Sequence, residues 1–346
     1  MRALCLASSL LVAGCLYDDA YVCHQDTSCV GSDRKGVCVP SGFAESYCAV
    51  MDHACASGLR WDRTADPTLA STCVLATVDL NAIYGIGPAD LFAVGNGGLI
   101  LHSSDGANWT QPTSGTTNDL FAVWGISKGP IFAVGGGTSP VIVTSNDDGT
   151  TWTPVQIMGS AGGLTGIWGT GSGDVYAVGG PFVVASHDGG LTWQPSMQMN
   201  VALTSVWGSA ADDVYASGRN GAIVHSTDRG STWQPLMSGT THSFWSVWGA
   251  DANDVFVVGE RGEIRHSVDH GATWTAIGSG TIEELRSING AGQDFYIAGQ
   301  ATLLHSATAG ASWSPLDARN AYFNGVWASP AASYAVGRVG AFLRVQ

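Results

Sequence analysis

The sequence predicts an all-β fold: a seven-bladed β-propeller preceded by a small disulfide-rich segment. Three observations predict it: a repeat of about 41 residues, four short β-rich runs within each repeat, and a composition rich in glycine and tryptophan but poor in charge. The 346 residues include 47 Gly and 13 Trp, and only 12% are charged. Short strands joined by tight turns need glycine, and a hydrophobic fraction of 45% is ample for a core.

The repeat is clearest between residues 206 and 233. The unit runs from Val206-Trp207-Gly208 through the segments 213–218 and 221–226, and it ends at a tryptophan. Gly and Asp turns separate four β-rich runs, a pattern typical of one propeller blade. The final tryptophan recurs over five intervals, about every 41 residues, at Trp109, Trp152, Trp193, Trp233, Trp274 and Trp313.

Seven units can be counted from their first strands. The seventh unit stops after three strands at Gln346, and we expect a segment near residues 72–77 to supply its outer strand. That strand would close the ring over residues 71–346 and remove an exposed sheet edge. Each first strand carries a small residue, as expected where inner strands crowd a central channel: Ala82, Ala122, Gly166, Ser205, Ser246, Ser287 and Gly325.

The turn before each final tryptophan has the pattern Ser-x-Asp-x-Gly-x-Thr-Trp. The first copy is one residue shorter, and Thr308 replaces Asp in the last. We expect the Asp to accept backbone N–H bonds, the Gly to adopt a conformation that other residues resist, and the Trp to pack into the sheet. A calcium loop is the weaker interpretation, because the oxygen spacing of EF-type loops is missing. The structural Asp residues are Asp105, Asp147, Asp188, Asp228 and Asp269.

This pattern resembles the Asp box of the bacterial neuraminidase repeat. The repeat is shared by sialidases, xyloglucan-cleaving glycosidases, sortilin-type receptors and photosystem II assembly factors, and the last group is similar in having one seven-bladed ring without an inserted domain. The resemblance covers about residues 72–346 and implies the architecture. It implies little about activity, since the Arg-Ile-Pro element that carries the first catalytic-site arginine of sialidases is absent here.

The N-terminus predicts export. Residues 1–14 combine a short positive start with an apolar run too short to span a bilayer, and Leu11-Val12-Ala13-Gly14-Cys15 resembles a lipobox. We therefore expect a lipoprotein signal peptide and lipidation of Cys15, with an ordinary secretory signal as the alternative. No Asp stands directly beside Cys15, which favours the outer membrane or cell surface over retention in the inner membrane.

The eight cysteines all lie at or before Cys73. An exported segment as short as residues 15–70 cannot build an adequate core, so six of them are expected to form three disulfides with the pairing left open. Zinc is the alternative, disfavoured because no CxxC pair occurs. A disulfide at Cys73 would tie this head to the propeller. The six are Cys23, Cys29, Cys38, Cys48, Cys55 and Cys73.

The charged residues suggest one candidate binding surface. The net charge of −14 disfavours nucleic acid as a partner. Only 12 Arg and 2 Lys occur, yet several Arg fall in turns between second and third strands or in outer-to-inner connections, which share one rim. They could hold a carboxylate or phosphate, and solvated rim charge is the alternative. The candidates are Arg219, Glu260, Arg261, Arg338, Trp245 and Arg286, with Glu283 and Glu284 nearby.

These observations favour a surface-tethered, monomeric scaffold or binding module for a protein or glycan, without cofactor or metal. A sialidase-like glycoside hydrolase is the alternative, and an acid/base carboxylate pair on the rim would favour it. A purely structural envelope protein is the third. The repeated histidines are expected to pack or support turns, because metal ligation would need several to converge: His102, His225, His266 and His305.

Overall fold

The computed structural model describes residues 78–157, 162–171, 173–316, 318 and 321–345, and the backbone of three strands before them. The chain divides into two compact units, one of Met1–Ser41 and Glu45–Val74 and the other of Gly42–Ala44 and Leu75–Gln346. Within the described part of the chain, no helix is long and apolar enough to cross a membrane.

In the first unit, three strands form an antiparallel sheet in the order β1-β2-β3. The register sets Cys38 opposite Cys48. Cys15, Cys23, Cys29, Cys55 and Cys73 lie outside the described residues, so the disulfides and the lipid anchor stay predictions. The strands are β1 (Val37–Pro40), β2 (Ser46–Met51) and β3 (Leu59–Trp61).

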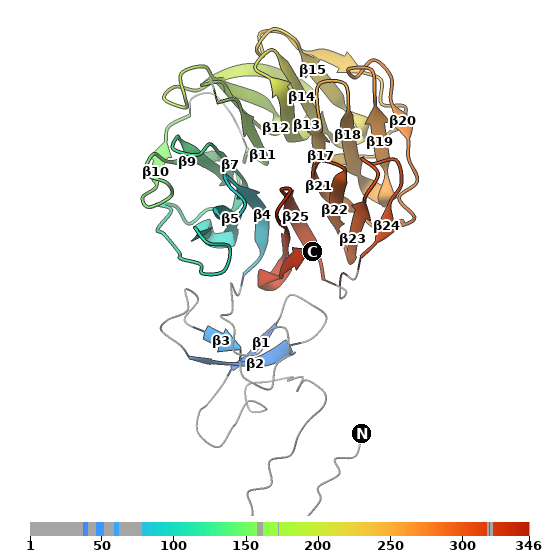
Figure 1. Cartoon of the computed structure of the whole chain (residues 1–346). Helices are drawn as coiled ribbons and strands as arrows, with labels where there is room; N and C mark the ends of the chain where they lie inside the picture. Colours follow the sequence, from blue (N-terminus) through green and yellow to red (C-terminus); the bar gives the residue numbers. More distant parts are fainter. Residues whose placement is uncertain are drawn as a thin grey trace, which may run out of the picture. The chain divides into compact units, whose positions relative to one another are not determined.

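The described part of the second unit consists of six antiparallel sheets arranged as a ring (Figure 1). The central strands are buried on both faces, because each sheet packs between two others, and they are therefore continuously apolar, as in β5 and β18. The first two sheets contain β4 (Leu80–Gly85), β5 (Leu91–Gly95) and β6 (Ile100–Ser103), then β7 (Leu120–Gly125), β8 (Ile131–Gly136), β9 (Pro140–Ser145) and β10 (Thr153–Val155).

The third sheet has six strands, and the last three sheets have four, four and three. The third contains β11 (Gly166–Gly169), β12 (Val175–Ser186), β13 (Gln194–Ala210), β14 (Asp213–Gly218), β15 (Ile223–Ser226) and β16 (Gln234–Leu236). The others contain β17 (Phe244–Gly249), β18 (Val255–Gly259), β19 (Ile264–Ser267) and β20 (Thr275–Ala276); β21 (Leu285–Ala291), β22 (Asp294–Gly299), β23 (Thr302–Ser306) and β24 (Ser314–Pro315); and β25 (Phe323–Ala328), β26 (Ser333–Gly337) and β27 (Phe342–Val345). Four short 3-10 turns are η2 (Asn96–Gly98), η3 (Arg219–Gly221), η4 (Glu260–Gly262) and η5 (Arg338–Gly340).

The expectation of seven separate blades is not confirmed, because the described residues form six blade sheets. The six-stranded sheet contains the segments of two sequence repeats, those ending at Trp193 and Trp233. At three of the other connections a Ser-Gly-Thr turn, as at residues 238–240, separates an outer strand from the next inner one. Residues 197–203 have no such turn. The strand β13 continues through them and pairs with both β12 and β14, which joins the two repeats in one sheet.

The first and last sheets pack together and close the ring. Leu80 and Ile83 share a buried cluster with Trp327 and Tyr334. The Asn324 side-chain amide donates to the Leu80 carbonyl at 3.0 Å, so polar contacts join the same two inner strands. The closing strand expected near residues 72–77 lies outside the described residues and stays a prediction.

The small residues of the inner strands lie where neighbouring strands approach closely. A Cβ added at Gly325 would come within 3.0 Å of the Ala82 Cα. Serine at the same position has a second use, because its hydroxyl accepts the backbone N–H of the next inner strand. These bonds join Ser205 to Val247, Ser246 to Ile288 and Ser287 to Val326, at 3.2, 3.4 and 3.1 Å.

The turn that ends each repeat packs on the preceding repeat. The rings of Trp193 and Phe132 lie edge to face, with centroids 6.0 Å apart. In the same turn, Gly190 leaves room for that ring: a Cβ added there would lie 2.3 Å from two Phe132 atoms. Gly189 also has positive φ, but a Cβ added there meets nothing within 4 Å.

This pair of glycines provides a direct test of the packing between repeats. We expect Gly189→Ala to cost only the backbone strain, about 1–2 kcal/mol. Gly190→Ala adds a clash with Phe132 and should cost about 1–3 kcal/mol more. Urea unfolding of both variants measures the difference. Equal losses would show that the turn does not pack on Phe132.

Candidate binding surface

One rim of the ring is built where two kinds of loop meet. In η3 the residue after Arg219, Asn220, has φ of 58°, and Gly221 follows with φ of 71°. A Cβ added at Gly221 would lie 2.1 Å from the Thr240 carbonyl oxygen, so only glycine lets the two loops approach this closely. The Ser238 hydroxyl donates to the Gly221 carbonyl at 2.7 Å. The turn bearing Arg219 is thus held against the connection that leads into β17.

At this rim, two arginines flank one tryptophan. The Arg219 guanidinium carbon lies 5.7 Å from the centre of the Trp245 ring, and that of Arg286 lies 5.6 Å from it. Both distances are in the range of cation–π attraction. The structure places Trp245 in β17 and Arg286 in β21, and not in the connections before these strands, as expected from the sequence. The three residues come from three successive repeats, and we call them the Arg-Trp-Arg cluster.

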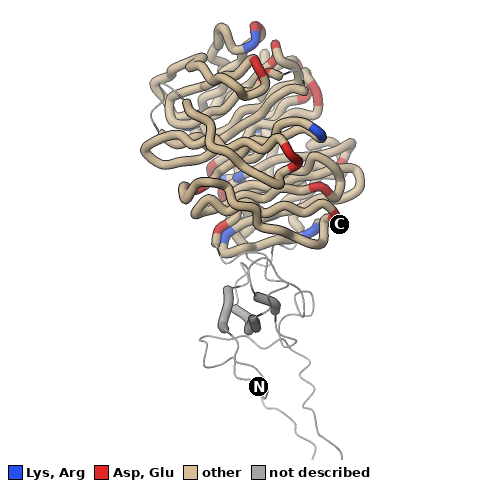
Figure 2. The backbone as a smooth tube through the Cα atoms, turned by 90° about the vertical axis from the view of Figure 1, so that its left-hand side faces the viewer, with Lys and Arg blue, Asp and Glu red and all other residues tan. Residues whose placement is uncertain are grey.

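The cluster retains unused hydrogen-bond donors. Arg286 donates to Glu284 at 2.5 Å, whereas Arg219 has no ion pair within the described residues. A guanidinium that stacks by its face keeps its N–H edge free for a carboxylate. The Trp245 indole N–H is buried and has no acceptor among the described residues. The chain has 28 acidic and 14 basic residues, and Figure 2 marks where both kinds lie along the backbone. A local concentration of cationic donors is therefore unusual for this chain.

The other predicted candidates lie apart from the cluster. The Glu260 carboxylate accepts the Ser243 backbone N–H at 2.9 Å and therefore holds its turn against the segment before β17. The Arg338 guanidinium stacks on Tyr322 at 4.9 Å from the ring centre. Arg261 lines a shallow depression of about 670 Å³ beside Ile282. Among the described residues, Glu260, Arg261 and Arg338 make no hydrogen bond, ion pair or ring contact with the cluster. Glu283 is half-buried beside Glu284.

The residue that precedes the small residue of each inner strand distinguishes the repeats that form the cluster. The residue before the small inner-strand residue usually bonds to a neighbouring inner strand: Thr204, for example, donates to the Phe244 carbonyl at 2.7 Å. Phe121, Trp245 and Arg286 depart from this pattern. The side chains that follow it are Asn81, Thr165, Thr204 and Asn324. Aligning the repeats one residue before the small position would have shown the departure.

At the opposite ends of these strands, the Ser-x-Asp turns have repeated contacts. Asp188 accepts the Thr192 N–H at 2.9 Å, the Thr192 hydroxyl at 2.6 Å and the Ser186 hydroxyl at 2.7 Å. These bonds, chiefly those from Thr192, lower the pKa of Asp188 to about 2. The Trp193 indole donates to the Gly190 carbonyl at 3.1 Å. Equivalent carboxylate contacts occur at Asp147, Asp228 and Asp269; Asp105 instead binds Ala107 and Asn108, and Thr308 accepts the Ser312 N–H.

The lowered pKa of Asp188 makes stability depend on pH. Because the folded-state pKa lies below the ordinary 3.8, this contribution is present above pH 4 and is lost as the pH falls toward 2. We expect Asp188→Asn to reduce the protons taken up on unfolding near pH 3 by about one. Urea midpoints measured from pH 4 to pH 2 test this. An unchanged dependence on pH would contradict it.

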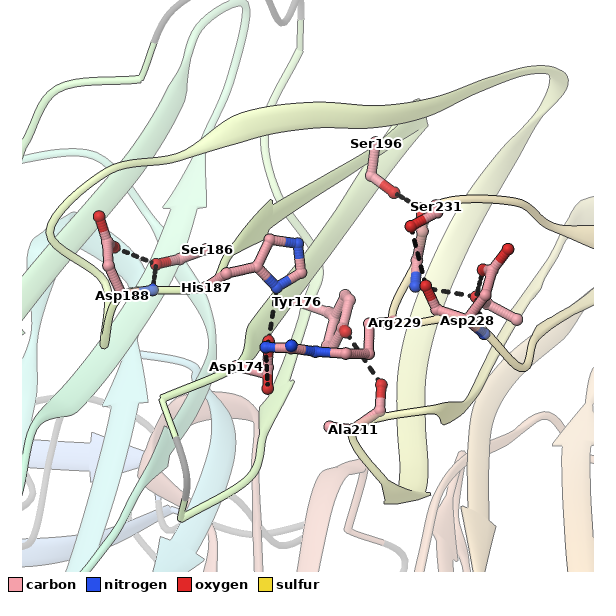
Figure 3. A network of polar contacts seen from close by, with 12 residues as sticks. Asp174, Tyr176, Ser186, His187, Asp188, Ser196, Ala211, Asp228, Arg229 and Ser231 are labelled. Carbon is pink, nitrogen blue, oxygen red and sulfur yellow. Dashed lines mark hydrogen bonds and ion pairs between the residues drawn. The ribbon is translucent and has the colours of Figure 1, made fainter.

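The same edge carries bonds between carboxylates and cationic or imidazole groups. Buried Asp174 accepts the His187 ring nitrogen Nδ1 at 2.5 Å and Arg229 at 2.7 and 2.9 Å (Figure 3). Burial raises the pKa of Asp174, but these bonds outweigh burial and hold its pKa below the ordinary value. Arg229 comes from the turn of the next repeat, so the contact joins two repeats. Each of the repeated histidines forms a hydrogen bond with an Asp and stacks on an aromatic ring. His102, for example, bonds to Asp90 and stacks on Phe92.

Comparison with known proteins identifies the fold. The chain is a β-propeller. Among solved structures it is similar to YCF48 bound to D1 peptide, with 17% identity, a TM-score of 0.65, and coverage of 78% of this chain and 93% of that one. YCF48 from Cyanidioschyzon merolae is 15% identical, with a TM-score of 0.65, and the match covers 78% of this chain and 96% of that one. The Niastella koreensis GH74 enzyme is 16% identical, with a TM-score of 0.64, and the match spans 78% of this chain but only 52% of the enzyme. No family model and no curated protein matches the chain.

Proposed function

We propose that the protein is a non-enzymatic binding module whose Arg-Trp-Arg cluster holds a carboxylate-bearing segment of a partner. The observation that carries the proposal is the stacking of Arg219 and Arg286 on Trp245, which fixes two guanidinium groups beside one aromatic surface. Charge-assisted bonds from such groups to a carboxylate are among the stronger polar contacts in proteins. Tryptophan and arginine are also the residues that contribute most to binding at protein interfaces.

A peptide is the favoured partner. One structural neighbour is bound to a peptide. Catalysis of glycoside cleavage needs two free carboxyl groups flanking the bond. Glu260 is bonded to a backbone N–H of its own chain and Glu284 to Arg286, which supports binding over acid/base chemistry at this rim. Hydrolysis of an anionic glycan is the second candidate, and it draws on the likeness to the GH74 enzyme.

The test uses residues 15–346 with Cys15→Ser, and arrays of acidic peptides and anionic oligosaccharides. Each acidic peptide is paired with a version in which Glu and Asp are replaced by Gln and Asn. We expect acidic peptides to bind and the Arg219→Ala, Arg286→Ala double variant to lose at least about 10-fold in affinity. Arg344→Ala, at an exposed arginine that stacks on Tyr334 instead, is the matched control. Equal binding by the double variant would refute the proposal, and glycan binding with cleavage would favour the second candidate.

The proposal includes tethering and ring organisation. Lipidation of Cys15 would hold a monomeric module on the outer membrane or cell surface, with residues 15–70 as a disulfide-bonded head. In the ring, the six-stranded sheet counts as two of seven repeat units. Palmitate labelling that is lost in Cys15→Ser would support the anchor, and release of the wild type into the soluble fraction would argue against it.

A further inference from the structure

Three side chains with metal-binding atoms converge at the opposite end of β14 from Arg219. They are Asp213 at the start of β14, His225 in β15 and His270 in the turn after β19. The Asp213 Oδ1 atom lies 2.6 Å from His225 Nε2 and 2.8 Å from His270 Nε2. All three ligand atoms lie within 4.8 Å of one another. His270 is not one of the histidines that recur at one place in the repeat, so the spacing of the repeat does not predict this convergence.

Two of the three groups are buried and held in place. The Asp213 side chain is 9% exposed, and its second oxygen accepts the Ser209 hydroxyl. The His225 ring, also 9% exposed, stacks on Tyr215 with centroids 4.0 Å apart and planes 7° apart. Contacts of this kind fix the orientation of metal ligands. The His270 side chain is 45% exposed, so an ion can reach the group from solvent.

The neighbouring repeat has a different side chain at this position. Beside Asp174, the equivalent turn residue is Arg229, whose guanidinium supplies the positive partner for the buried carboxylate (Figure 3). His270 stands where Arg229 stands, with similar φ of 57° and 59°. Beside Asp254 the equivalent residue is Ala309, which has no ligand atom. Within the described residues, this is the one group in which a carboxylate and two imidazoles meet.

We propose that Asp213, His225 and His270 bind a divalent transition-metal ion of the Zn²⁺ type. Two imidazole nitrogens and one carboxylate oxygen are a ligand set for such ions, whereas Ca²⁺ and Mg²⁺ prefer oxygen alone. Ligand atoms about 2.1 Å from a tetrahedral Zn²⁺ are about 3.4 Å apart, so the group must open by less than about 1 Å. The exposed His270 can provide this movement. The hydroxyl of Tyr215, whose ring stacks on His225, is buried and has no hydrogen-bond partner among the described residues.

A metal here would join two sheets, since β14 and β15 belong to the six-stranded sheet and His270 to the next. An ion bound only by the folded state stabilises it in proportion to the logarithm of its concentration. The site therefore has a thermal readout that is independent of any partner. It does not rest on the proposed binding function, because the Arg-Trp-Arg cluster lies at the other end of the strands.

The experiment titrates the chelator-treated protein, residues 15–346 with Cys15→Ser, with Zn²⁺ by calorimetry and with Co²⁺ by visible absorption. His270→Arg reproduces the arrangement at Asp174 and should fold without a metal. His305→Ala, which removes a two-residue His–Asp pair, is the control. We expect a site on the wild type and on His305→Ala that raises the melting temperature, and at least about 100-fold weaker binding by His270→Arg. No Zn²⁺ binding by the wild type, or equal binding by His270→Arg, would overturn the proposal.

Discussion

Replacing Trp152 with alanine is expected to lower the free energy of unfolding by about 3–5 kcal/mol. Trp152 is 6% exposed and packs edge to face on Phe92 of the preceding repeat, with ring centroids 6.2 Å apart. Its indole N–H also donates to the Gly149 carbonyl at 3.1 Å. The substitution therefore leaves a large cavity between two sheets and removes one of the bonds that hold the turn.

Trp152→Phe separates these two effects. Phenylalanine keeps most of the buried surface and loses the hydrogen bond, so a loss of about 1 kcal/mol is expected. Guanidinium unfolding of both variants gives the values. A loss below about 1 kcal/mol for Trp152→Ala would mean that the tryptophan does not join the repeats.

Asp213→Ala is expected to cost a comparable amount, about 3–5 kcal/mol when measured with a chelator present. The change leaves Ser209, His225 and His270 without their shared acceptor. Burial raises the pKa of Asp213, but the bonds from these three groups outweigh burial and lower it below 3.8. The stabilisation is thus present above that pH and is lost as the pH falls below it.

Asp254→Ala is the matched control for Asp213→Ala. Asp254 is more exposed, with 27% of its side chain accessible, and His266 is the one histidine that it contacts in the described part of the chain. Its loss should therefore be smaller, about 1 kcal/mol. Thermal or urea unfolding at pH 7 and pH 3 compares the two variants. Equal losses at pH 7 would show that convergence on Asp213 adds nothing to stability.

Much of the fold could be predicted because its determinants are local. The Ser-x-Asp pattern gives the turn, and the spacing of glycine and apolar residues gives the strands on either side. The six-stranded sheet was not predicted, because the absence of a Ser-Gly-Thr turn from residues 197–203 is not distinctive: the connections at residues 156–165 and 316–322 lack it too. Such a segment can form a loop or an extended strand, and the outcome depends on its pairing with β12 and β14. Leu203, for example, pairs with Gly180 and with Gly218, and the sequence pattern within one repeat does not reveal these pairs.

The candidate sites were predicted less completely, for a related reason. The sequence predicts that Arg219, Trp245 and Arg286 lie on one rim, but only the register of the inner strands, which contain Trp245 and Arg286, shows that they meet. The sequence predicts Glu260 on the same surface, but its carboxylate instead accepts the Ser243 backbone N–H. His270 was missed, since its contact with Asp213 depends on packing between repeats, which spacing within one repeat cannot reveal.

A double-mutant cycle tests the central claim most directly. Affinity is measured for an acidic peptide selected from the array and for its amide version, each with the wild type and with Arg219→Ala. If the arginine holds the carboxylate, the two changes should couple by about 1.5 kcal/mol or more. Changes that simply add, with no coupling at Arg219 and none when the cycle is repeated at Arg286, would contradict the assignment of the Arg-Trp-Arg cluster as the binding site.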